Sequence, residues 1–550
     1  MSVASASSDP NQPSFSAEPS ASLINPTLGT NWQLDSVSGL YKLTNPDPGA
    51  KNSLTVGMYG SGLGKFGPNV TQGTFATNGA GIEIGTLYAD LYAGSGSGNK
   101  ILTFDFSKVK DNNYALKGNL QIKGNKSNTN EQTDTSKFIG TFGGKGISGN
   151  ILINTAAKQA NFTFNGNANL EGHLIIEQGS GDGKTKDKGH SFIFDQGGIK
   201  GSVLAVTGNS SSNEFSFDST RSNGDAHISG GILVANGTGG PNLYHTFVFG
   251  SKNQSQVVIS GELQDKKPAG IASNSSWEAT HGLKGGKYAI VVRADADSGA
   301  KNSNTQANFL FETNAKVGKV LAVNYQTTNT SSKANYVIKS GKKVTFDSIE
   351  SKQKGDTTIT LESNASATVL NGILTDSSGT NTISLGGDAT FNIQGGTDNK
   401  ITTLNFNGTA GGNIFNINGG TTTSITTLTL NGSTGNVLNA KSGTTTIGTL
   451  TLSNSTTNNT INANGGSTTI TNAVSLNNNT TLNLGIGNGN LTLTNHLTAG
   501  NSNTGTANIN FTGNGTLTSN LSVGSSGTLT SNLSTTATNG TININVASGD

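Results

Sequence analysis

The amino-acid sequence predicts an all-β protein: a single-stranded right-handed parallel β-helix (β-solenoid) with loop or hairpin excursions. Three observations support this prediction. Apolar and polar residues alternate at strand spacing, the alternating segments recur every 22 to 31 residues, and Gly, Asn, Ser and Thr lie between them. One such repeat has too few apolar side chains to bury them alone, so successive repeats have to stack. Equivalent positions then form columns, with neighbouring strands about 4.8 Å apart.

The clearest repeat lies in the C-terminal part, where one hexapeptide recurs. Its copies begin at Ile401, Ile425 and Ile447, and Ile470 opens a looser fourth, at spacings of 24, 22 and 23 residues. Between the copies recur two asparagines three positions apart and a threonine run: Asn413/Asn416, Asn436/Asn439, Asn459/Asn462, and Thr421 to Thr423, Thr444 to Thr446, Thr468 and Thr469. Each repeat therefore holds two or three short strands.

The N-terminal part carries another form of the repeat, in which a phenylalanine pair precedes a strand with a central glycine. These coil glycines recur at spacings of 31, 23, 29, 29 and 31 residues: Gly118, Gly149, Gly172, Gly201, Gly230, Gly261. The pairs before them, with one more before Gly318, are Phe104/Phe106, Phe138/Phe142, Phe162/Phe164, Phe192/Phe194, Phe215/Phe217, Phe247/Phe249 and Phe309/Phe311. We expect their rings to stack as a ladder. An antiparallel sandwich gives no reason for such recurrence.

The repeats suggest four regions along the chain. Residues 1–37 are expected to form a flexible N-terminal segment, and residues 38–100 an N-terminal cap with the first coils. Residues 101–345 would form the β-helix with Phe-ladder coils, interrupted by an excursion at 265–306. Residues 346–550 would form a β-helix with Asn/Thr/Gly-rich coils, truncated at the C-terminus. We interpret the transition near 345 as a change of cross-section, not a domain boundary.

Composition excludes several classes of protein. Charged residues are 12% of the chain and the net charge is +2, whereas disorder normally combines low hydrophobicity with high net charge. The 34 basic and 32 acidic residues are scattered, so we expect no nucleic-acid partner. No run of about 18 apolar residues occurs, so we expect no membrane span in this fragment. Cysteine is absent, which excludes disulfides and thiolate metal sites.

The repeat length, the F-x-F and I-x-x-L-x-L strands, the Asn/Gly/Thr-rich corners and the absence of cysteine resemble the passenger regions of type V autotransporters, over most of residues 38–550. The resemblance implies a bacterial virulence protein, exported across the outer membrane and either cell-surface or secreted, that acts as an adhesin or interaction scaffold. Neither a signal peptide nor a translocator barrel is recognisable, so we expect a fragment of a longer protein. The expected partner is a host cell surface or a glycan. The oligomeric state stays open.

Two alternatives are a vacuolating-toxin-like secreted protein and a β-helical glycan-active enzyme. The toxins depend on an apolar N-terminal segment of small-residue repeats, and residues 1–35 contain none. We predict that the chain is not an enzyme, and we assign no catalytic, cofactor-binding or metal-binding residue and no cofactor. A near match to a nucleophile elbow at Gly60-Ser61-Gly62 and a calcium-repeat-like Gly179-Ser-Gly-Asp182 are both expected by chance in a glycine-rich chain.

The remaining polar candidates are interpreted as structural. The histidines show no metal-site spacing and are each taken as surface imidazoles: His173, His190, His227, His245, His281, His496. Asp195, Asp218 and Asp225 sit at different offsets from their coil glycines, so we expect them at different corners. The Asn and Thr columns allow two readings. Buried stacks would bond along the coil axis, whereas outward threonine rows could bind a repetitive glycan or ice; we favour structure.

Overall fold

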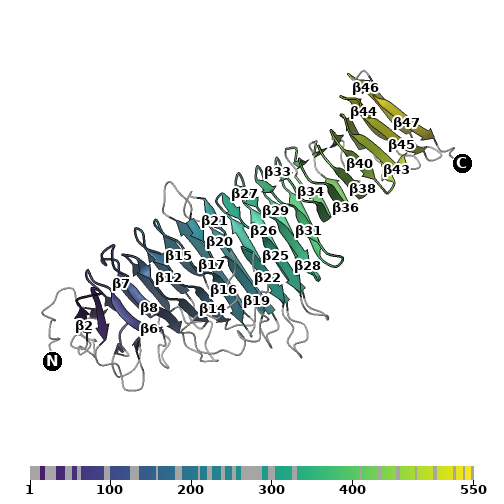
Figure 1. Ribbon diagram of the computed structural model, residues 1–550. Coiled ribbons are helices and arrows are strands. Elements are labelled where there is room, and N and C mark those ends of the chain that lie inside the picture. The colour runs from purple at the N-terminus through teal and green to yellow at the C-terminus, as the bar shows by residue number, and fades with distance from the viewer. Residues whose placement is uncertain are drawn as a thin grey trace. The chain divides into compact units, whose positions relative to one another are not determined.

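A computed structural model describes residues 13–18, 32–43, 52–58, 64–67, 69–91, 100–123, 136–155, 159–179, 189–207, 211–219, 226–236, 242–250, 256–261, 288–294, 304–324, 331–408, 411–431, 435–453, 459–476, 480–499, 504–523, 528–536 and 539–546. This part of the chain is all-β and forms a β-solenoid of about 14 turns, so the predicted fold class is confirmed. Strands of successive coils pair in parallel, and Figure 1 shows neighbouring strands of a sheet one after another along the chain. None of the described residues forms a helix long and apolar enough to cross a membrane.

The chain divides into two compact units, Met1–Phe309 with Tyr325–Ser331 and Leu310–Asn324 with Ser332–Asp550. In unit 1 the first sheet contains β1 (Ser14–Glu18), β5 (Gln72–Ala76), β7 (Ile101–Phe106), β9 (Lys137–Phe142), β12 (Gln159–Phe164), β15 (Gly189–Phe194), β17 (Ser211–Ser219) and β20 (Asn242–Phe249). Its second sheet contains β2 (Trp32–Asp35), β3 (Leu40–Leu43), β4 (Ser53–Gly57), β6 (Ile82–Asp90), β8 (Leu116–Lys123), β10 (Gly146–Ile147), β11 (Ile151–Thr155), β13 (Asn169–Leu170), β14 (Leu174–Gly179), β16 (Val203–Thr207), β19 (Ile232–Asn236) and β22 (Ile290–Ala294). The third contains β18 (Ala226–Ile228) and β21 (Val257–Ile259).

Unit 2 has the same three kinds of sheet, and the division between the units falls within β23 (Asn304–Phe311). The first sheet contains β26 (Ser331–Ile338), β29 (Gly355–Leu361), β32 (Thr380–Leu385), β34 (Asp398–Phe406), β36 (Thr422–Asn431), β38 (Thr444–Ser453), β40 (Ser467–Ile470), β41 (Val474–Ser475), β43 (Asn490–Ala499), β45 (Thr516–Val523) and β47 (Thr541–Val546). The second contains β25 (Val320–Asn324), β28 (Ile349–Lys352) and β31 (Ile373–Thr375). The third contains β24 (Ala315–Val317), β27 (Lys343–Phe346), β30 (Ser366–Val369), β33 (Thr390–Ile393), β35 (Ile414–Ile417), β37 (Val437–Ala440), β39 (Asn459–Ala463), β42 (Thr480–Ile486), β44 (Thr504–Phe511) and β46 (Thr528–Thr535).

Stacked phenylalanine rings fill the core of unit 1 beneath the first sheet. β12 and β15 pair in register, so Phe162 lies on Phe192 with ring centroids 4.8 Å apart, and Phe164 lies on Phe194 at 4.6 Å. These rings are parallel and buried, and each removes a large apolar area from water. The predicted phenylalanine ladder is therefore confirmed.

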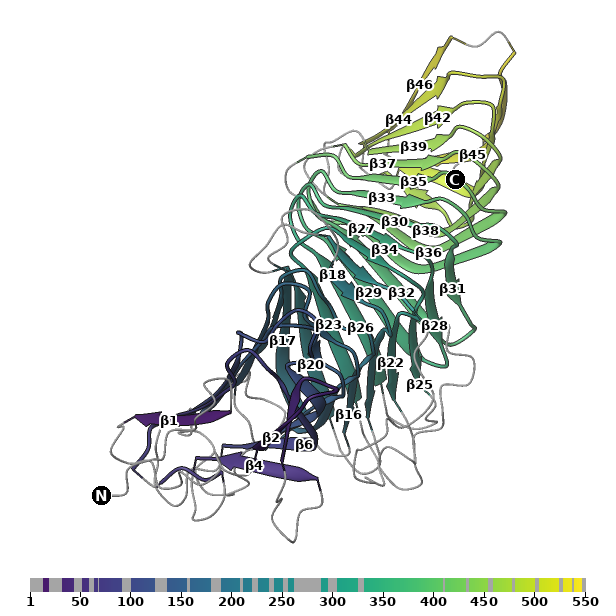
Figure 2. The same cartoon turned by 60° about the vertical axis from the view of Figure 1, so that its left-hand side comes forward.

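The ladder steps by two residues between β15 and β17, two strands that lie next to each other in Figure 1. The next strand of the sheet, β20, is labelled beside β17 in Figure 2. Phe192 pairs with Phe217, the second ring of its pair, and not with Phe215. As a result Phe215 lies opposite His190, with the two rings stacked 5.2 Å apart. A histidine therefore occupies a position in the aromatic column.

The coil glycines form a backbone column in unit 1. The N–H of Gly172 donates to the carbonyl of Gly149 at 3.2 Å, and the N–H of Gly201 donates to that of Gly172 at the same distance. A Cβ at Gly172 would lie 2.3 Å from the Gly149 carbonyl oxygen, far inside contact distance. Only glycine lets consecutive coils approach this closely, which explains why the residue recurs once per coil.

In three successive coils, the residue after the coil glycine caps the next coil. Asn119 Oδ1 accepts from the N–H of Asn150 at 2.8 Å, and Asn150 Oδ1 accepts from the N–H of His173 at 2.7 Å. His173 continues the series, because its Nδ1 accepts from the N–H of Ser202 at 3.0 Å. These side chains satisfy backbone donors that the short strands leave unpaired at the corner.

The N-terminal end of unit 1 is covered by two antiparallel strands. β1 pairs with β5, and β2 pairs with β3. Phe15 of β1 and Trp32 of β2 pack over Phe75, the first ring of the ladder, at 4.7 and 6.3 Å between centroids. The expectation that residues 1–37 are a flexible segment is thus wrong for 14–18 and 32–35, because these aromatic side chains cover the exposed end of the core. The rest of that range lies outside the described residues, apart from Pro13, Ser36 and Val37.

The expected excursion at 265–306 contains a core strand. Ile290–Ala294 forms β22, which pairs in parallel with β19 and is buried along its whole length. Its run of consecutive apolar residues belongs to a sheet with both faces covered, which is why it lacks the alternation that marked the other strands. The start of β23 also falls within this range, whereas residues 262–287 and 295–303 lie outside the described part.

Unit 2 changes its cross-section where the second sheet ends at β31. In the preceding coil the N–H of Ile349 donates to the carbonyl of Gly372, but the N–H of Ile373 in β31 donates to Asn399 Oδ1 at 2.9 Å. The Asn399 side chain thus replaces the backbone acceptor of a further strand. The second sheet therefore ends near residue 375, about 30 residues after the position at which the repeat changes in the sequence.

Buried asparagines form an inner ladder in the later coils of unit 2. Asn413 Nδ2 donates to Asn436 Oδ1 at 3.1 Å, and Asn436 Nδ2 donates to Asn459 Oδ1 at 3.0 Å. The same oxygens also accept from the backbone N–H groups of Asn413 and Asn436. All three side chains have no exposed surface. The structural reading of the asparagine columns is confirmed at these positions.

Candidate ligand-binding face

The outward side of the first sheet in unit 2 presents rows of hydroxyl groups. In β36 the side chains of Ile425, Leu428 and Leu430 are buried, so those of Thr427 and Thr429 point outward between them. The pattern follows from the hexapeptide, because strand alternation separates its leucines from its threonines. The neighbouring strands follow the same pattern.

Parallel pairing without a register shift aligns these side chains over β29, β32, β34, β36 and β38. One column contains Thr358, Thr382, Thr403, Thr427 and Thr449, and the other contains Thr360, Ser384, Asn405, Thr429 and Thr451. We call these ten residues the hydroxyl face. General strand geometry spaces its rows by about 4.8 Å along the coil axis and its two columns by about 6.7 Å.

The side chains of the hydroxyl face have few partners within the protein. In the described part of the chain, the side-chain hydrogen bond made to this face is the one from Asn472 Nδ2 to Thr449 Oγ1 at 2.8 Å. The side chains are nevertheless half-exposed or exposed, so water satisfies them. Threonine is also stiff at χ1, and an array of such residues loses little conformational entropy when a ligand binds.

The outward side of the third sheet differs from this face. There Asn416 Nδ2 donates to Asn392 Oδ1 at 2.9 Å, and Asn439 and Asn462 continue the row at 2.8 Å each. The row stops at Gly485, where a Cβ would lie 2.0 Å from Asn462 Oδ1. These amides already bond to one another, so they offer a ligand fewer free groups than the hydroxyl face does.

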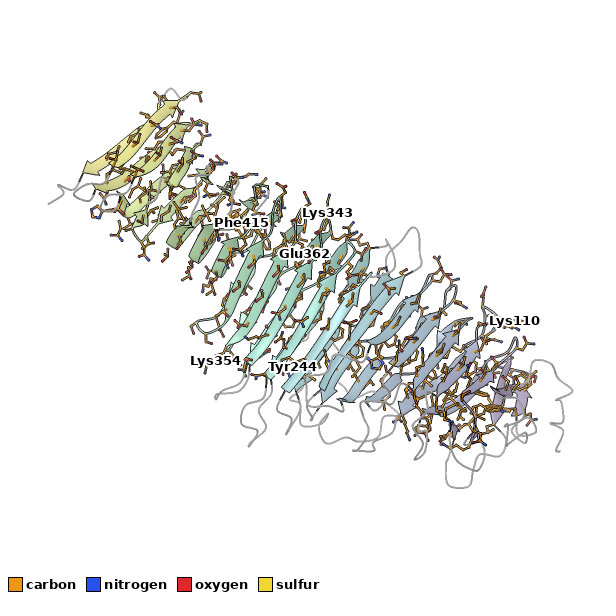
Figure 3. The ribbon with its side chains drawn as sticks, turned by 180° about the vertical axis from the view of Figure 1, so that it is seen from behind. Lys110, Tyr244, Lys343, Lys354, Glu362 and Phe415 are labelled. Carbon is orange, nitrogen blue, oxygen red and sulfur yellow. The ribbon has the colours of Figure 1, made fainter. Side chains whose placement is uncertain are left out.

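The ten residues of the hydroxyl face are uncharged, and two of the acidic residues beside it are paired with lysines. Lys339 Nζ lies 2.8 Å from Glu362 Oε1 near the end of β29, and Figure 3 labels Glu362 there. Lys400 Nζ lies 3.1 Å from Asp398 Oδ2 at the start of β34. The hydrogen bond from Lys400, helped by one from Thr422, holds the pKa of Asp398 below its ordinary value of 3.8. The face therefore suits an uncharged ligand better than an ionic one.

The threonine runs singled out in the sequence lie elsewhere. One residue of each run is buried in a common column, with Thr423 Oγ1 accepting from Asn399 Nδ2 at 3.4 Å: Thr423, Thr445 and Thr468. The runs are therefore structural at these positions, as predicted. The outward rows come from the hexapeptide, whose T-x-T spacing was the signal that the sequence analysis missed.

The histidines are not all surface groups, and the prediction is wrong for two of them. His190 and His245 are 2% and 0% exposed, since both occupy inward positions of first-sheet strands. His173 is half-buried at its corner, and His227 and His496 are exposed as predicted. His281 lies outside the described residues.

The two described aspartates that the sequence analysis singled out, Asp195 and Asp218, lie at different places in the coils. Asp195 follows β15 and accepts from the N–H of Gly166 at 3.1 Å, whereas Asp218 lies within β17. Among the described residues no group of three or more His, Asp or Glu side chains could hold a metal ion. Asp225, Ser61 and Asp182 lie outside the described part.

The fold and its outward hydroxyl columns define a β-solenoid repeat protein. Searches of protein-family models, curated proteins and solved structures found no match to the chain.

Proposed function

We propose that the chain is a bacterial passenger of the autotransporter kind, exported across the outer membrane and displayed at the cell surface or secreted. It acts as an adhesin or interaction scaffold and performs no catalysis. The β-solenoid fold supports this proposal, because stacked coils provide a rigid, repeated surface and do not require a pocket.

The observation that carries the proposal is the hydroxyl face. It presents a regular array of neutral donors and acceptors that make few hydrogen bonds within the described part of the chain. A polysaccharide with regularly spaced hydroxyl groups can bond to several rows at once, so many weak contacts add up to useful avidity. We therefore propose that the face binds an uncharged glycan at the host surface.

Two lysines on the hydroxyl face should weaken this binding. Thr403→Lys with Thr449→Lys places two ammonium groups on a neutral surface without making them adjacent, and the long side chains block the rows. We expect at least about tenfold weaker binding of the full chain to immobilised neutral polysaccharide and to host cells, since each lost polar contact contributes about 1 kcal/mol.

Thr390→Lys with Thr460→Lys is the matched control. Both positions are half-exposed and outward on the third sheet, away from the hydroxyl face. This variant should bind like the wild type. Equal loss in both variants, or a wild-type chain that binds acidic but no neutral polysaccharide, would contradict the assignment of the face.

A further inference from the structure

Outward hydroxyl groups continue along unit 2 beyond the hydroxyl face, which ends at β38. Ser424 on β36 pairs in register with Thr446 on β38, and the same column continues through β40 and β43 to β45. Figure 1 shows these five strands one after another. We call this column the axial strip, and its members are Ser424, Thr446, Thr469, Thr492 and Thr518.

Strand alternation directs the axial strip outward. In β38, Thr446 lies between the buried Thr445 and Ile447, and further along the column buried leucines take the place of buried threonines, as at Leu491 beside Thr492. The residues of the strip are half-exposed or exposed. Within the described part of the chain, their hydroxyl groups make no hydrogen bond to another side chain. The strip is therefore open to a ligand in the same way as the hydroxyl face.

The hydroxyl groups repeat along the coil axis, whereas their number across it is limited. Across one strand the hydroxyl face has two outward positions, and the adjacent Thr426 and Thr427 of β36 interrupt the alternation between the face and the strip. Along the axis, the face and the strip together follow the first sheet from β29 to β45, which is eight coils when β40 and β41 are counted as one. At general strand spacing this distance is about 34 Å, against about 6.7 Å across the face. A linear ligand therefore meets more hydroxyl groups when it lies along the axis.

No charged residue belongs to the hydroxyl face or to the axial strip, whose members are all Thr, Ser or Asn. Lys400 precedes Ser424 in the column of the strip, and Asp398 pairs with it at 3.1 Å between Nζ and Oδ2. At the other end of the surface, the half-exposed Val337 on β26 precedes Thr360 and ends one column of the face. The surface therefore favours a neutral ligand that carries many hydroxyl groups and extends over several coils.

We propose that the hydroxyl face and the axial strip bind an unbranched neutral polysaccharide whose extended chain lies parallel to the coil axis, with about one sugar unit for each coil. This inference rests on the proposed glycan binding and adds the form and direction of the glycan. A β-1,4-linked chain is a straight ribbon and can follow rows about 4.8 Å apart, because each sugar advances by a similar length. An α-1,4-linked chain of the same sugar curves and leaves the surface after a few units.

Titration of the full chain with oligosaccharides of increasing length tests the direction of the ligand. From the disaccharide to the hexasaccharide, the affinity for cello-oligosaccharides should rise about threefold or more with each added sugar, because each unit reaches the hydroxyl groups of a further coil. Malto-oligosaccharides contain the same sugar in α-1,4 linkage. Their affinity should stop rising after the first few units.

The variant Thr469→Lys with Thr518→Lys tests the axial strip and leaves all ten residues of the hydroxyl face unchanged. Both residues are half-exposed. We expect at least about tenfold weaker binding of soluble β-1,4-linked glucomannan, whose long chain needs the strip as well as the face. Cellotriose should bind nearly as to the wild type, because the face is intact. Thr390→Lys with Thr460→Lys, on the third sheet, is the control and should bind both ligands normally.

The outcomes separate this inference from the proposed function. An affinity that does not depend on chain length, or that rises equally for both linkages, would overturn the axial direction while glycan binding remains. Full binding of glucomannan by a folded strip variant would overturn the role of the strip. If the double variant does not fold, Thr469→Lys alone should still weaken the binding of glucomannan. A wild-type chain that binds none of these neutral glycans would contradict the proposed function itself.

Discussion

Gly172→Ala is expected to destabilise unit 1 by about 3 kcal/mol or more, one of the largest effects of a single methyl group in this chain. The added Cβ would lie 2.3 Å from the Gly149 carbonyl oxygen and 2.6 Å from Asn150 Oδ1. The backbone of the preceding coil cannot move away without breaking the hydrogen bond between the two glycines. Hydrogen exchange of the β11 and β14 amides under increasing urea measures the loss.

Gly189→Ala provides the matched control in the same unit. Nothing lies within 4 Å of a Cβ built at Gly189, which opens β15. Alanine also reduces the entropy of the unfolded chain, so this variant should be neutral or more stable by less than about 1 kcal/mol. Similar destabilisation by both substitutions would show that the coil glycines do not set the spacing.

Asn436→Ala is expected to cost unit 2 about 3 to 5 kcal/mol. It removes the oxygen that accepts from both the backbone N–H and the Nδ2 of Asn413, and it removes the donor to Asn459 Oδ1. These groups are buried without access to water, so each unsatisfied donor adds about 1 to 3 kcal/mol, and the truncated side chain leaves a cavity. Urea unfolding, followed by exchange at β35 and β37, reports the change.

Asn439→Ala is the control for the inner ladder, because Asn439 is the next asparagine of the same repeat. It bonds to Asn416 and Asn462 in an equally regular row, but on the half-exposed outward side. Water can replace its partners there, so we expect a cost of about 1 kcal/mol or less. A cost equal to that of Asn436→Ala would contradict the distinction between buried and outward ladders.

The sequence predicted the columns because each column repeats one residue type at a fixed spacing. Phe162 over Phe192 and Asn413 over Asn436 could be read directly from the recurrence of F-x-F and of the paired asparagines. The position of His190 in the ladder could not, because similar phenylalanine pairs suggest pairing of like with like. The actual register is shifted by two residues and joins Phe192 to Phe217.

Other features escaped prediction because they depend on contacts between distant residues. β22 has no alternating pattern, since both of its faces are covered. The end of the second sheet depends on one side chain, Asn399, which resembles many other asparagines in the sequence. The threonines of the hydroxyl face belong to the hexapeptides and could be seen in the sequence. Which threonines point outward and which are buried could be decided only from the register of the strands.

The most direct test of this account is a pair of engineered cysteines, because the chain has none of its own. Thr427→Cys with Thr449→Cys joins positions paired in register on β36 and β38, where a Cα separation of about 4.8 Å permits a disulfide. Thr427→Cys with Thr451→Cys lies on the same face but is offset by two residues, to roughly 8 Å. We predict rapid oxidation of the first pair and persistence of free thiols in the second. Preferential cross-linking of the offset pair, or of neither, would contradict the stacking of like residues coil upon coil.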